Sequence, residues 1–293
     1  MTNHKILSKK SFPAWEDLDI TDDFIFSKFM RNEEICKEIL NILLPIDVER
    51  IEYVEYQKSI DVTRVSKGVR LDVYAKSDNA VFNVEMQIGK SPDLARRSRY
   101  YQSAIDYDLL EKGSMYKELK DSFVIFICTF DPFGMGLPCY TFKNVCQEDG
   151  SQALEDGRQI IFFNTKAYFK EKNKLRSLLL AFMNGEKIND TKIVKYSNII
   201  EDIKHNNQWR MDYMNLALKF QDYEDLGMQK GRELGREEGR EEGREEGREE
   251  GQLEKALSTA KNLLKFLKDT EIAESTGLNL EEVKKLRKEQ NKI

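Results

Sequence analysis

Three oxygen-bearing side chains in the stretch 69–88, VRLDVYAKSDNAVFNVEMQI, have the types and spacing of a divalent-metal site. The stretch predicts two strands joined by a tight turn of two or four residues centred on 78–79. Residue i then lies opposite residue 157 − i, so Asp72 faces Glu85. Strand alternation puts Asn83, Glu85 and Gln87 on one face. Because like charges directly opposite each other destabilise a ladder, the pair indicates a shared cation such as Mg²⁺, which favours carboxylate oxygens.

A different interpretation of the same residues is the solvated polar face of an edge hairpin. Lys76 or Arg70 would then neutralise the acids without a metal. The two interpretations are separated by whether the folded chain brings the carboxylates within reach of one cation.

The other residue types argue against histidine or thiol chemistry. His4 and His205 are the only histidines, which disfavours His-based catalysis and His-rich metal sites. The four cysteines show no CxxC spacing, and we expect reduced thiols in a cytoplasmic protein rather than a zinc site or disulfides. They are Cys36, Cys128, Cys139 and Cys146. Any chemistry is therefore expected from carboxylates, Lys or hydroxyls.

Length and composition indicate a soluble, highly charged protein with one domain and appendages, or two small domains. The 293 residues are 40% hydrophobic and 34% charged, and no run approaches the roughly 18 apolar residues of a membrane span. The N-terminal residues lack an apolar core, so no secretory signal is expected. The net charge of −5 does not favour nucleic-acid binding, but residues 231–251 hold five Arg and nine Glu. The remainder is near neutral and leaves room for local basic patches.

A capped helix and a strand are expected before the hairpin. Thr21-Asp22-Asp23 is a good cap for a helix through FIFSKFMRNEEICKEILNILLP. The apolar pattern allows a break near Asn32, and Pro45 ends the helix. Residues 47–60 alternate weakly and are predicted as the first strand.

A helix and three more strands are expected after the hairpin. Ser91 is predicted as the cap, with Pro92 at the first helical position and Asp93 in the first turn, followed by LARRSRYYQSAIDYDLL. The apolar side of this helix consists of Leu94, Ser98, Tyr101, Ile105 and Leu109. Strands are predicted over 123–130, 139–145 and 159–165, the first being apolar enough to be covered on both faces. Strand, helix, strand order predicts an α/β fold with a partly parallel sheet, followed by three helical segments within 168–228.

The composition changes abruptly over residues 231–251, where GREE occurs four times. Six glycines at four-residue spacing each cost about 1 kcal/mol relative to Ala in a helix, so an isolated helix should be marginal. We interpret residues 231–251 as a polar spacer that is helical only when it is assembled with something. Residues 252–293 then predict a small helical unit of helix-turn-helix outline, with Gly277 at a helix end and Asn279 with Glu282 capping the last helix.

The D72-(x)12-E85-M-Q87 pattern, with TDDFIFSKF before it and ARRSRYYQ after it, resembles the PD-(D/E)xK nuclease superfamily. Within that superfamily the chain is similar to the Rpn family of recombination-promoting nucleases, also called putative transposases. The resemblance covers roughly residues 15–230, the expected nuclease domain, and extends to the GREE repeats and helical tail. It implies a restriction-endonuclease-like α/β core, a mixed central sheet flanked by helices, with a helical C-terminal extension.

The resemblance assigns roles to the acids. Asp72 and Glu85 match the metal-binding residues, and Gln87 stands where the superfamily places a Lys. Gln can orient water or ligate through its carbonyl but brings no charge, so its presence puts the rate and activity in question. Asp23 is the expected additional catalytic acid, with Asp22 as its rival and a plain helix cap as the alternative role.

Basic and amide residues after the hairpin complete the expected site. Lys90, Arg96 and Arg99 are candidates for contacts to DNA phosphates, and Gln102 for a supporting role beside the acids. The alternative is that Arg96, Arg97 and Arg99 form an exposed helix face, and that Tyr100 and Tyr101 are packing residues.

The implied function is a cytoplasmic, Mg²⁺- or Mn²⁺-dependent DNA endonuclease that serves recombination or mobile elements. Two alternatives remain: a catalytically weak or inactive module that binds DNA or a partner protein, and a phage-defence or toxin-like component. DNA is the expected partner, a homodimer through 231–251 or the helical tail is a further expectation, and no membrane association is expected.

Overall fold

The computed structural model describes residues 12–60 and 68–290, and forms two compact units, Met1–Ala217 and Leu218–Ile293. The N-terminal residues 1–11, which include His4 and most of the stretch where no secretory signal was expected, lie outside the described residues. The division falls earlier than residue 230, the expected end of the nuclease domain. Each unit is described by itself.

The first unit is built on a mixed six-stranded sheet with the strand order β1-β2-β3-β4-β6-β5. The first three strands are antiparallel, β3, β4 and β6 run parallel, and β5 is antiparallel to β6. The bounds are β1 Tyr53–Ile60, β2 Val69–Lys76, β3 Ala80–Gln87, β4 Asp121–Cys128, β5 Cys139–Phe142 and β6 Arg158–Asn164. This confirms the predicted α/β class with a partly parallel sheet.

The β2–β3 hairpin has the predicted register. Val73 pairs with Val84 and Lys76 with Val81, so the residue numbers of each pair sum to 157. The backbone N–H of Ser77 donates to the carbonyl of Ala80 at 2.8 Å, which gives the shorter of the two expected loops.

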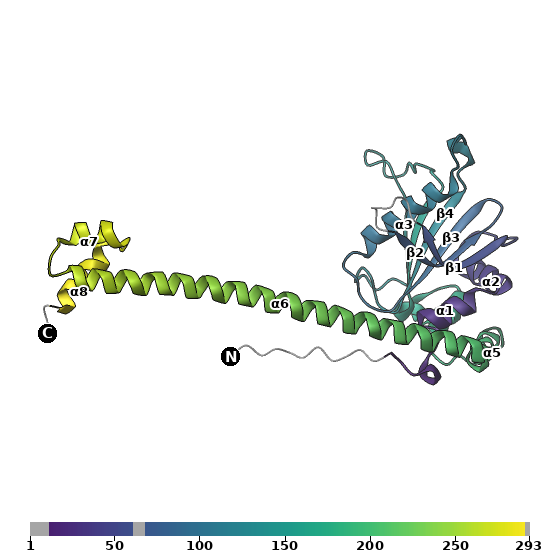
Figure 1. Cartoon of the computed structure of the whole chain (residues 1–293). Coiled ribbons are helices and arrows are strands. Elements are labelled where there is room, and N and C mark those ends of the chain that lie inside the picture. Colours follow the sequence, from purple (N-terminus) through teal and green to yellow (C-terminus); the bar gives the residue numbers. More distant parts are fainter. Residues whose placement is uncertain (1–11, 61–67, 291–293) are drawn as a thin grey trace. The chain divides into compact units, whose positions relative to one another are not determined.

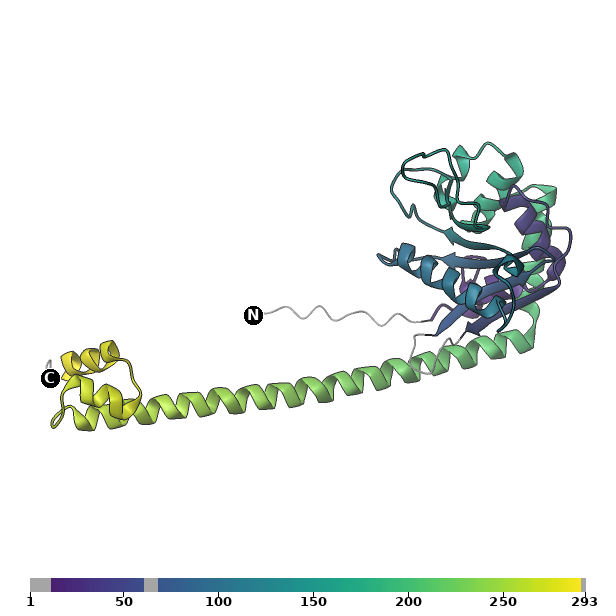
Figure 2. The ribbon, with the colours of Figure 1, turned by 90° about the horizontal axis from the view of Figure 1, so that it is seen from above.

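Helices cover both faces of this sheet (Figures 1 and 2). The helix α3 packs on one face over a buried cluster that includes Leu71, Phe126 and Phe162. The other face carries α1, α2, α4 and α5 around a larger cluster that includes Phe26 and Tyr196. The bounds are α1 Asp23–Met30, α2 Glu33–Leu43, α3 Leu94–Leu109, α4 Lys174–Met183, α5 Thr191–His205 and α6 Asn207–Leu263, with 3₁₀ turns at Trp15–Asp17, Tyr116–Glu118 and Thr165–Lys170.

Local capping explains where the helices begin. The Asp22 carboxylate accepts the N–H of Phe24 at 2.9 Å and caps α1. Asn32 caps α2, which confirms the expected break. The predicted start of α3 is wrong: the residue preceding its first turn is Asp93 rather than Ser91, and no side chain caps it. The reason is that Pro92 and Asp93 form a turn before the helix, which begins at Leu94.

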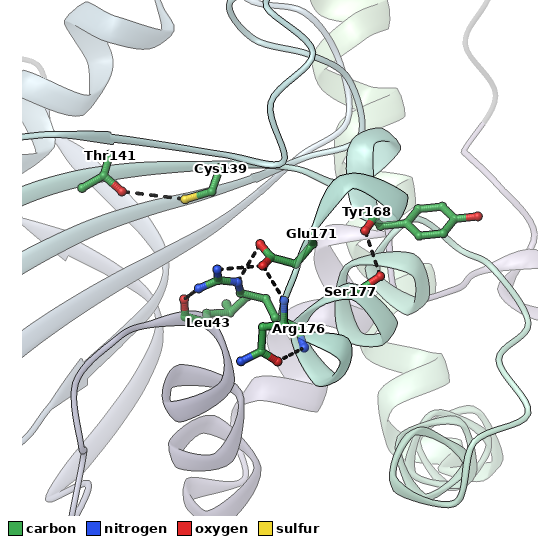
Figure 3. A network of polar contacts seen from close by, with 8 residues as sticks. Leu43, Cys139, Thr141, Tyr168, Glu171, Arg176 and Ser177 are labelled. Atoms are coloured by element: carbon green, nitrogen blue, oxygen red, sulfur yellow. Dashed lines mark hydrogen bonds and ion pairs between the residues drawn. The ribbon is translucent and has the colours of Figure 1, made fainter.

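An ion pair between Arg176 of α4 and Glu171, just before that helix, also contacts the end of α2 (Figure 3). The Arg176 Nε lies 2.8 Å from Glu171, and its Nη1 donates to the carbonyl of Leu43 at the end of α2. The Glu171 side chain is only 5% exposed. Burial alone would raise the pKa of Glu171, but hydrogen bonds from Arg176 and the backbone of Asn173 hold it below its ordinary value.

The second unit contains the later part of α6 with α7 (Asp269–Thr276) and α8 (Leu280–Gln290). Ala260, Leu264, Ile272, Leu278 and Val283 form its small core. Gly277 ends α7 with φ +75°, a conformation that favours glycine. Asn279 and Glu282 exchange backbone-to-side-chain hydrogen bonds of 3.1 and 2.9 Å, so the predicted capping box is confirmed.

Residues 231–251 lie within the continuous helix α6, so the repeat is helical, and its need for assembly stays a prediction. The physical reason is that α6 begins in the packed first unit, where Tyr213 is buried and Trp209 packs against the core. Helix nucleation is the costly step, and extension of an existing helix through the repeat needs only propagation.

Candidate active site

The site lies where β2 and β3 stop pairing with each other. Their ladder ends at Val73 and Val84, one residue before the two acids. There the backbone N–H of Asp72 donates to Glu85 Oε1 at 3.0 Å instead of to a backbone carbonyl. The Asp72 carboxylate in turn accepts the backbone N–H of Met86. The turn arithmetic that placed Asp72 opposite Glu85 therefore holds, and the two carboxyl groups occupy the gap between the strands.

Burial makes both acids resist ionisation. The side chain of Glu85 is 3% exposed, and burial followed by the charge of Asp72 raises its pKa to about 8. Burial, and then the nearby charge of Asp23, raises the pKa of Asp72 to about 6. Desolvation and like charge both disfavour the anionic form of a carboxyl group. A cation bound between the acids would reverse this preference.

The structure separates the roles of the rival acids at the start of α1. Asp22 is the helix cap, and Asp23, the first helical residue, is the one whose charge acts on Asp72. Partial desolvation, then the charge of Asp22, raises the pKa of Asp23. Asp23 is therefore not the cap that the alternative interpretation made it, and its position favours the expected role as an additional acid.

Gln87 is engaged at both ends of its amide. Its Oε1 accepts from Arg97 Nη2 at 2.6 Å, and its Nε2 donates to the carbonyl of Gly89 at 2.7 Å. Gln87 lies on the same face of β3 as Asn83 and Glu85, as the alternation predicted.

Arg97 is the site residue that sequence reasoning missed. Its Nη2 lies 3.8 Å from Glu85 Oε2, and its guanidinium carbon lies over the rings of Phe126 and Tyr101, 5.0 and 5.5 Å from their centroids. A signal was present, because position 97 is three residues after Leu94 and four before Tyr101. Both were assigned to the buried side of the helix, so Arg97 falls between them on that side.

Gln102 does not support the acids. Its Nε2 donates to the side chains of Ser122 and Asp106, which ties α3 to the start of β4. Ser122 pairs with Val81, four residues before Glu85, which places this contact about 13 Å along the sheet from the acids at roughly 3.3 Å per residue. The expected position of Gln102 is therefore wrong.

The proposed phosphate contacts lie at the surface. Lys90 follows β3, and Arg96 and Arg99 lie in the first half of α3, all with exposed side chains. Arg96 Nη1 is 3.9 Å from Asp93, a solvent-exposed pair worth little in stability. Tyr100 is exposed, whereas Tyr101 packs against the cluster beneath α3.

The donor set fits a hard cation that keeps part of its water shell. In residues 12–60 and 68–290, no three His, Cys, Asp or Glu side chains converge into a closed metal cage. Mg²⁺ is commonly held by one or two carboxylates with waters and substrate phosphates, which is what Asp72 and Glu85 offer. Beside them, the buried side-chain amide of Asn83 hydrogen-bonds to Glu85, which partly offsets the rise in the pKa of that carboxyl group.

The mixed sheet, the flanking helices and the paired acids define a nuclease-like α/β domain. The family model described as "PD-(D/E)XK nuclease family transposase" matches residues 21–215. The chain belongs to this family of putative transposases within the PD-(D/E)xK superfamily. Comparison with curated proteins and with solved structures gives no match.

Proposed function

We propose that the protein is a metal-dependent DNA endonuclease of the Rpn type that hydrolyses phosphodiester bonds in recombination or mobile-element activity. The observation that supports it most strongly is that buried Glu85 and half-buried Asp72 meet where two strands stop pairing, with the backbone N–H of Asp72 donating to Glu85 Oε1 at 3.0 Å. A bare hairpin has no stability reason to keep two desolvated acids with raised pKa values at one point.

The residues divide the work as follows. Asp72 and Glu85 would hold Mg²⁺ or Mn²⁺, and Asp23 adds negative charge that favours a cation over protons. A bound divalent ion supplies a Lewis acid for the phosphate and lowers the pKa of a bound water. Lys90, Arg96 and Arg99 are the proposed contacts to flanking phosphates, a role that their exposure permits.

Plasmid nicking tests this proposal. We expect wild type to nick plasmid DNA with Mg²⁺ and to bind it without cleavage in Ca²⁺, and we expect Asp72→Ala and Glu85→Ala to abolish nicking. Wild type that binds DNA in a gel shift but does not cut it with Mg²⁺ or Mn²⁺ would identify a binding module. Wild type that does neither would refute the site assignment.

A binding module is the second candidate, and one observation favours it. Both ends of the Gln87 amide are occupied, by Arg97 and by Gly89, so Gln87 is not free to orient a water or to ligate a metal without giving up a contact. The ExK lysine that would carry charge at this position is absent. The nicking assay separates the two candidates.

DNA is the proposed partner, in keeping with the nuclease family, and a homodimer through residues 231–251 or the helical tail remains a proposal. Within the described residues, the space that a Cβ would occupy on each glycine of the repeat is open for 4 Å around, so a partner helix could approach closely. Light scattering of the full chain with and without residues 231–293 tests it. A cytoplasmic location is likewise proposed, supported by four free cysteines. No described helix is long and apolar enough to cross a membrane.

A further inference from the structure

The positively charged side chain that pairs with Glu85 comes from α3. Arg97 Nη2 contacts both Gln87 and Glu85, at 2.6 and 3.8 Å. Arg97 forms an ion pair with Glu85, whereas Arg70 of β2 acts on Asp72 and Asp23 through its charge. The charge of Arg97 also partly offsets the rise in the pKa values of Asp72, Asp23 and Glu85.

Packing holds the Arg97 guanidinium in one place. The group lies over the Phe126 ring and near the Tyr101 ring, and only 31% of the side chain is exposed. A guanidinium stacked on an aromatic face is restricted to a plane, and its hydrogen-bond donors then point along fixed directions. Its Nε is buried without a hydrogen-bond partner in the described residues. The guanidinium carries five N–H donors, and its Nη2 is the one that the contacts to Gln87 and Glu85 engage.

The same contacts explain the unusual residue at position 87. A Lys at this position would place a second cation against Arg97, at the 2.6 Å separation that the Gln87 carbonyl now occupies. Gln instead accepts a hydrogen bond from Arg97 and anchors its own amide to Gly89. A neutral acceptor at 87 and a cation at 97 are thus one complementary arrangement.

We propose that Arg97 is the catalytic cation of this site, binding the scissile phosphate, and that Gln87 is a positioning residue that orients it. This inference rests on the proposed endonuclease function. Phosphodiester hydrolysis accumulates negative charge on the phosphate oxygens in the transition state, and a preorganised guanidinium can make two hydrogen bonds to such oxygens. The positive charge that a Lys at position 87 of β3 would supply comes instead from Arg97 of α3.

A set of charge-relocation variants tests the proposal with a plasmid-nicking assay. Removal of one preorganised donor costs about 10²–10³ in rate, so Arg97→Met should lose about that factor in kcat. Arg97→Lys should retain more activity than Arg97→Met, and Gln87→Lys in the Arg97→Met background should restore at least tenfold. Gln87→Ala should lower the nicking rate of wild type but not that of Arg97→Met, because Gln87 acts only by orienting Arg97.

Arg158→Met is the matched control. Arg158 has a similarly exposed side chain, 34%, and a similar ion pair, 3.6 Å from Asp156, but it lies at the start of β6 away from the acids. We expect wild-type cleavage from this variant. Circular dichroism and thermal unfolding confirm that each variant is folded before its rate is compared.

A metal-free binding measurement separates failure of this inference from failure of the proposed function. The binding of a short fluorescent DNA duplex is measured in EDTA at several salt concentrations. Arg97→Met should reduce the magnitude of the slope of log K against log salt by about 0.9, the value for one phosphate contact, and adding Gln87→Lys to Arg97→Met should restore it. Wild type that never cleaves overturns the proposed function, and the salt slope then decides the role of Arg97.

Three outcomes overturn the assignment of Arg97. The first is a folded Arg97→Met that cleaves within threefold of wild type. The second is a folded, inactive Arg97→Met that neither Arg97→Lys nor the Gln87→Lys relocation improves by tenfold. The third applies if wild type does not cleave, and it is a salt slope of DNA binding that is the same for Arg97→Met as for wild type.

Discussion

Replacing Glu85 with Gln should stabilise the metal-free protein while removing its activity. Glu85 has an ordinary pKa of 4.5 and a pKa of about 8 in the folded chain, because burial and the charge of Asp72 disfavour its anion. The folded protein therefore holds a proton that the unfolded chain releases between these pH values, and its unfolding free energy falls as pH rises through that window. Gln has the same shape, needs no proton and can still accept the Asp72 N–H through its carbonyl.

The size of the effect follows from the pH window. Each pH unit above 4.5 costs the wild type about 1.4 kcal/mol until the folded pKa is reached. At pH 7 the advantage of Glu85→Gln should therefore be about 3 kcal/mol, and below pH 4.5 it should vanish. With an m-value of about 2–3 kcal/mol per molar urea, this is a rise of about 1 M in the urea midpoint at pH 7.

Urea unfolding at several pH values from 4.5 to 8 in EDTA measures this directly. Glu171→Gln is the matched control of opposite sign, because hydrogen bonds from Arg176 and the backbone, set against burial, lower the Glu171 pKa. Glu171 therefore contributes stability that is present above its unfolded pKa and is lost as pH falls, so its replacement should destabilise most at neutral pH. A Glu85→Gln protein that is less stable than wild type at pH 7, or whose advantage does not change with pH, would refute the reasoning.

Three further outcomes are expected. Saturating Mg²⁺ should raise the melting temperature of wild type more at pH 8 than at pH 6, because metal binding must displace protons from Asp72 and Glu85, whose pKa values are raised. Calorimetry in two buffers should detect the release of these protons. Arg176→Ala should lower the free energy of unfolding by about 3 kcal/mol, measured in urea, since it leaves Glu171 buried without its partner; an effect below about 1 kcal/mol would show that water replaces the pair. Gly277→Ala should destabilise the second unit by about 1 kcal/mol because its φ is +75°, and hydrogen exchange over α7 and α8 should show the change there and not in the sheet.

Local patterns in the sequence determined the hairpin and its faces. A side-chain period of two and a short turn fix both the position of Asp72 opposite Glu85, one residue beyond the end of the ladder, and the shared face of Glu85 and Gln87. The same local logic located the helix break at Asn32 and the caps at Gly277 and Asn279, because a cap bonds to the adjacent turn of its own helix. Strand and helix order was enough for the α/β class.

The tertiary structure decided which charged groups reach the acids. The orientation of α3 on the sheet selects Arg97 rather than Arg96 or Arg99, and it sends Gln102 to Ser122 instead of the acids. It also decided that the repeat continues a helix already begun in the first unit. Spacing within one element fixes a face to within a residue or two, whereas contact between elements depends on how the whole core packs. The sequence by itself therefore determined that two acids meet, and only the packing of a helix on the sheet showed which cation meets them.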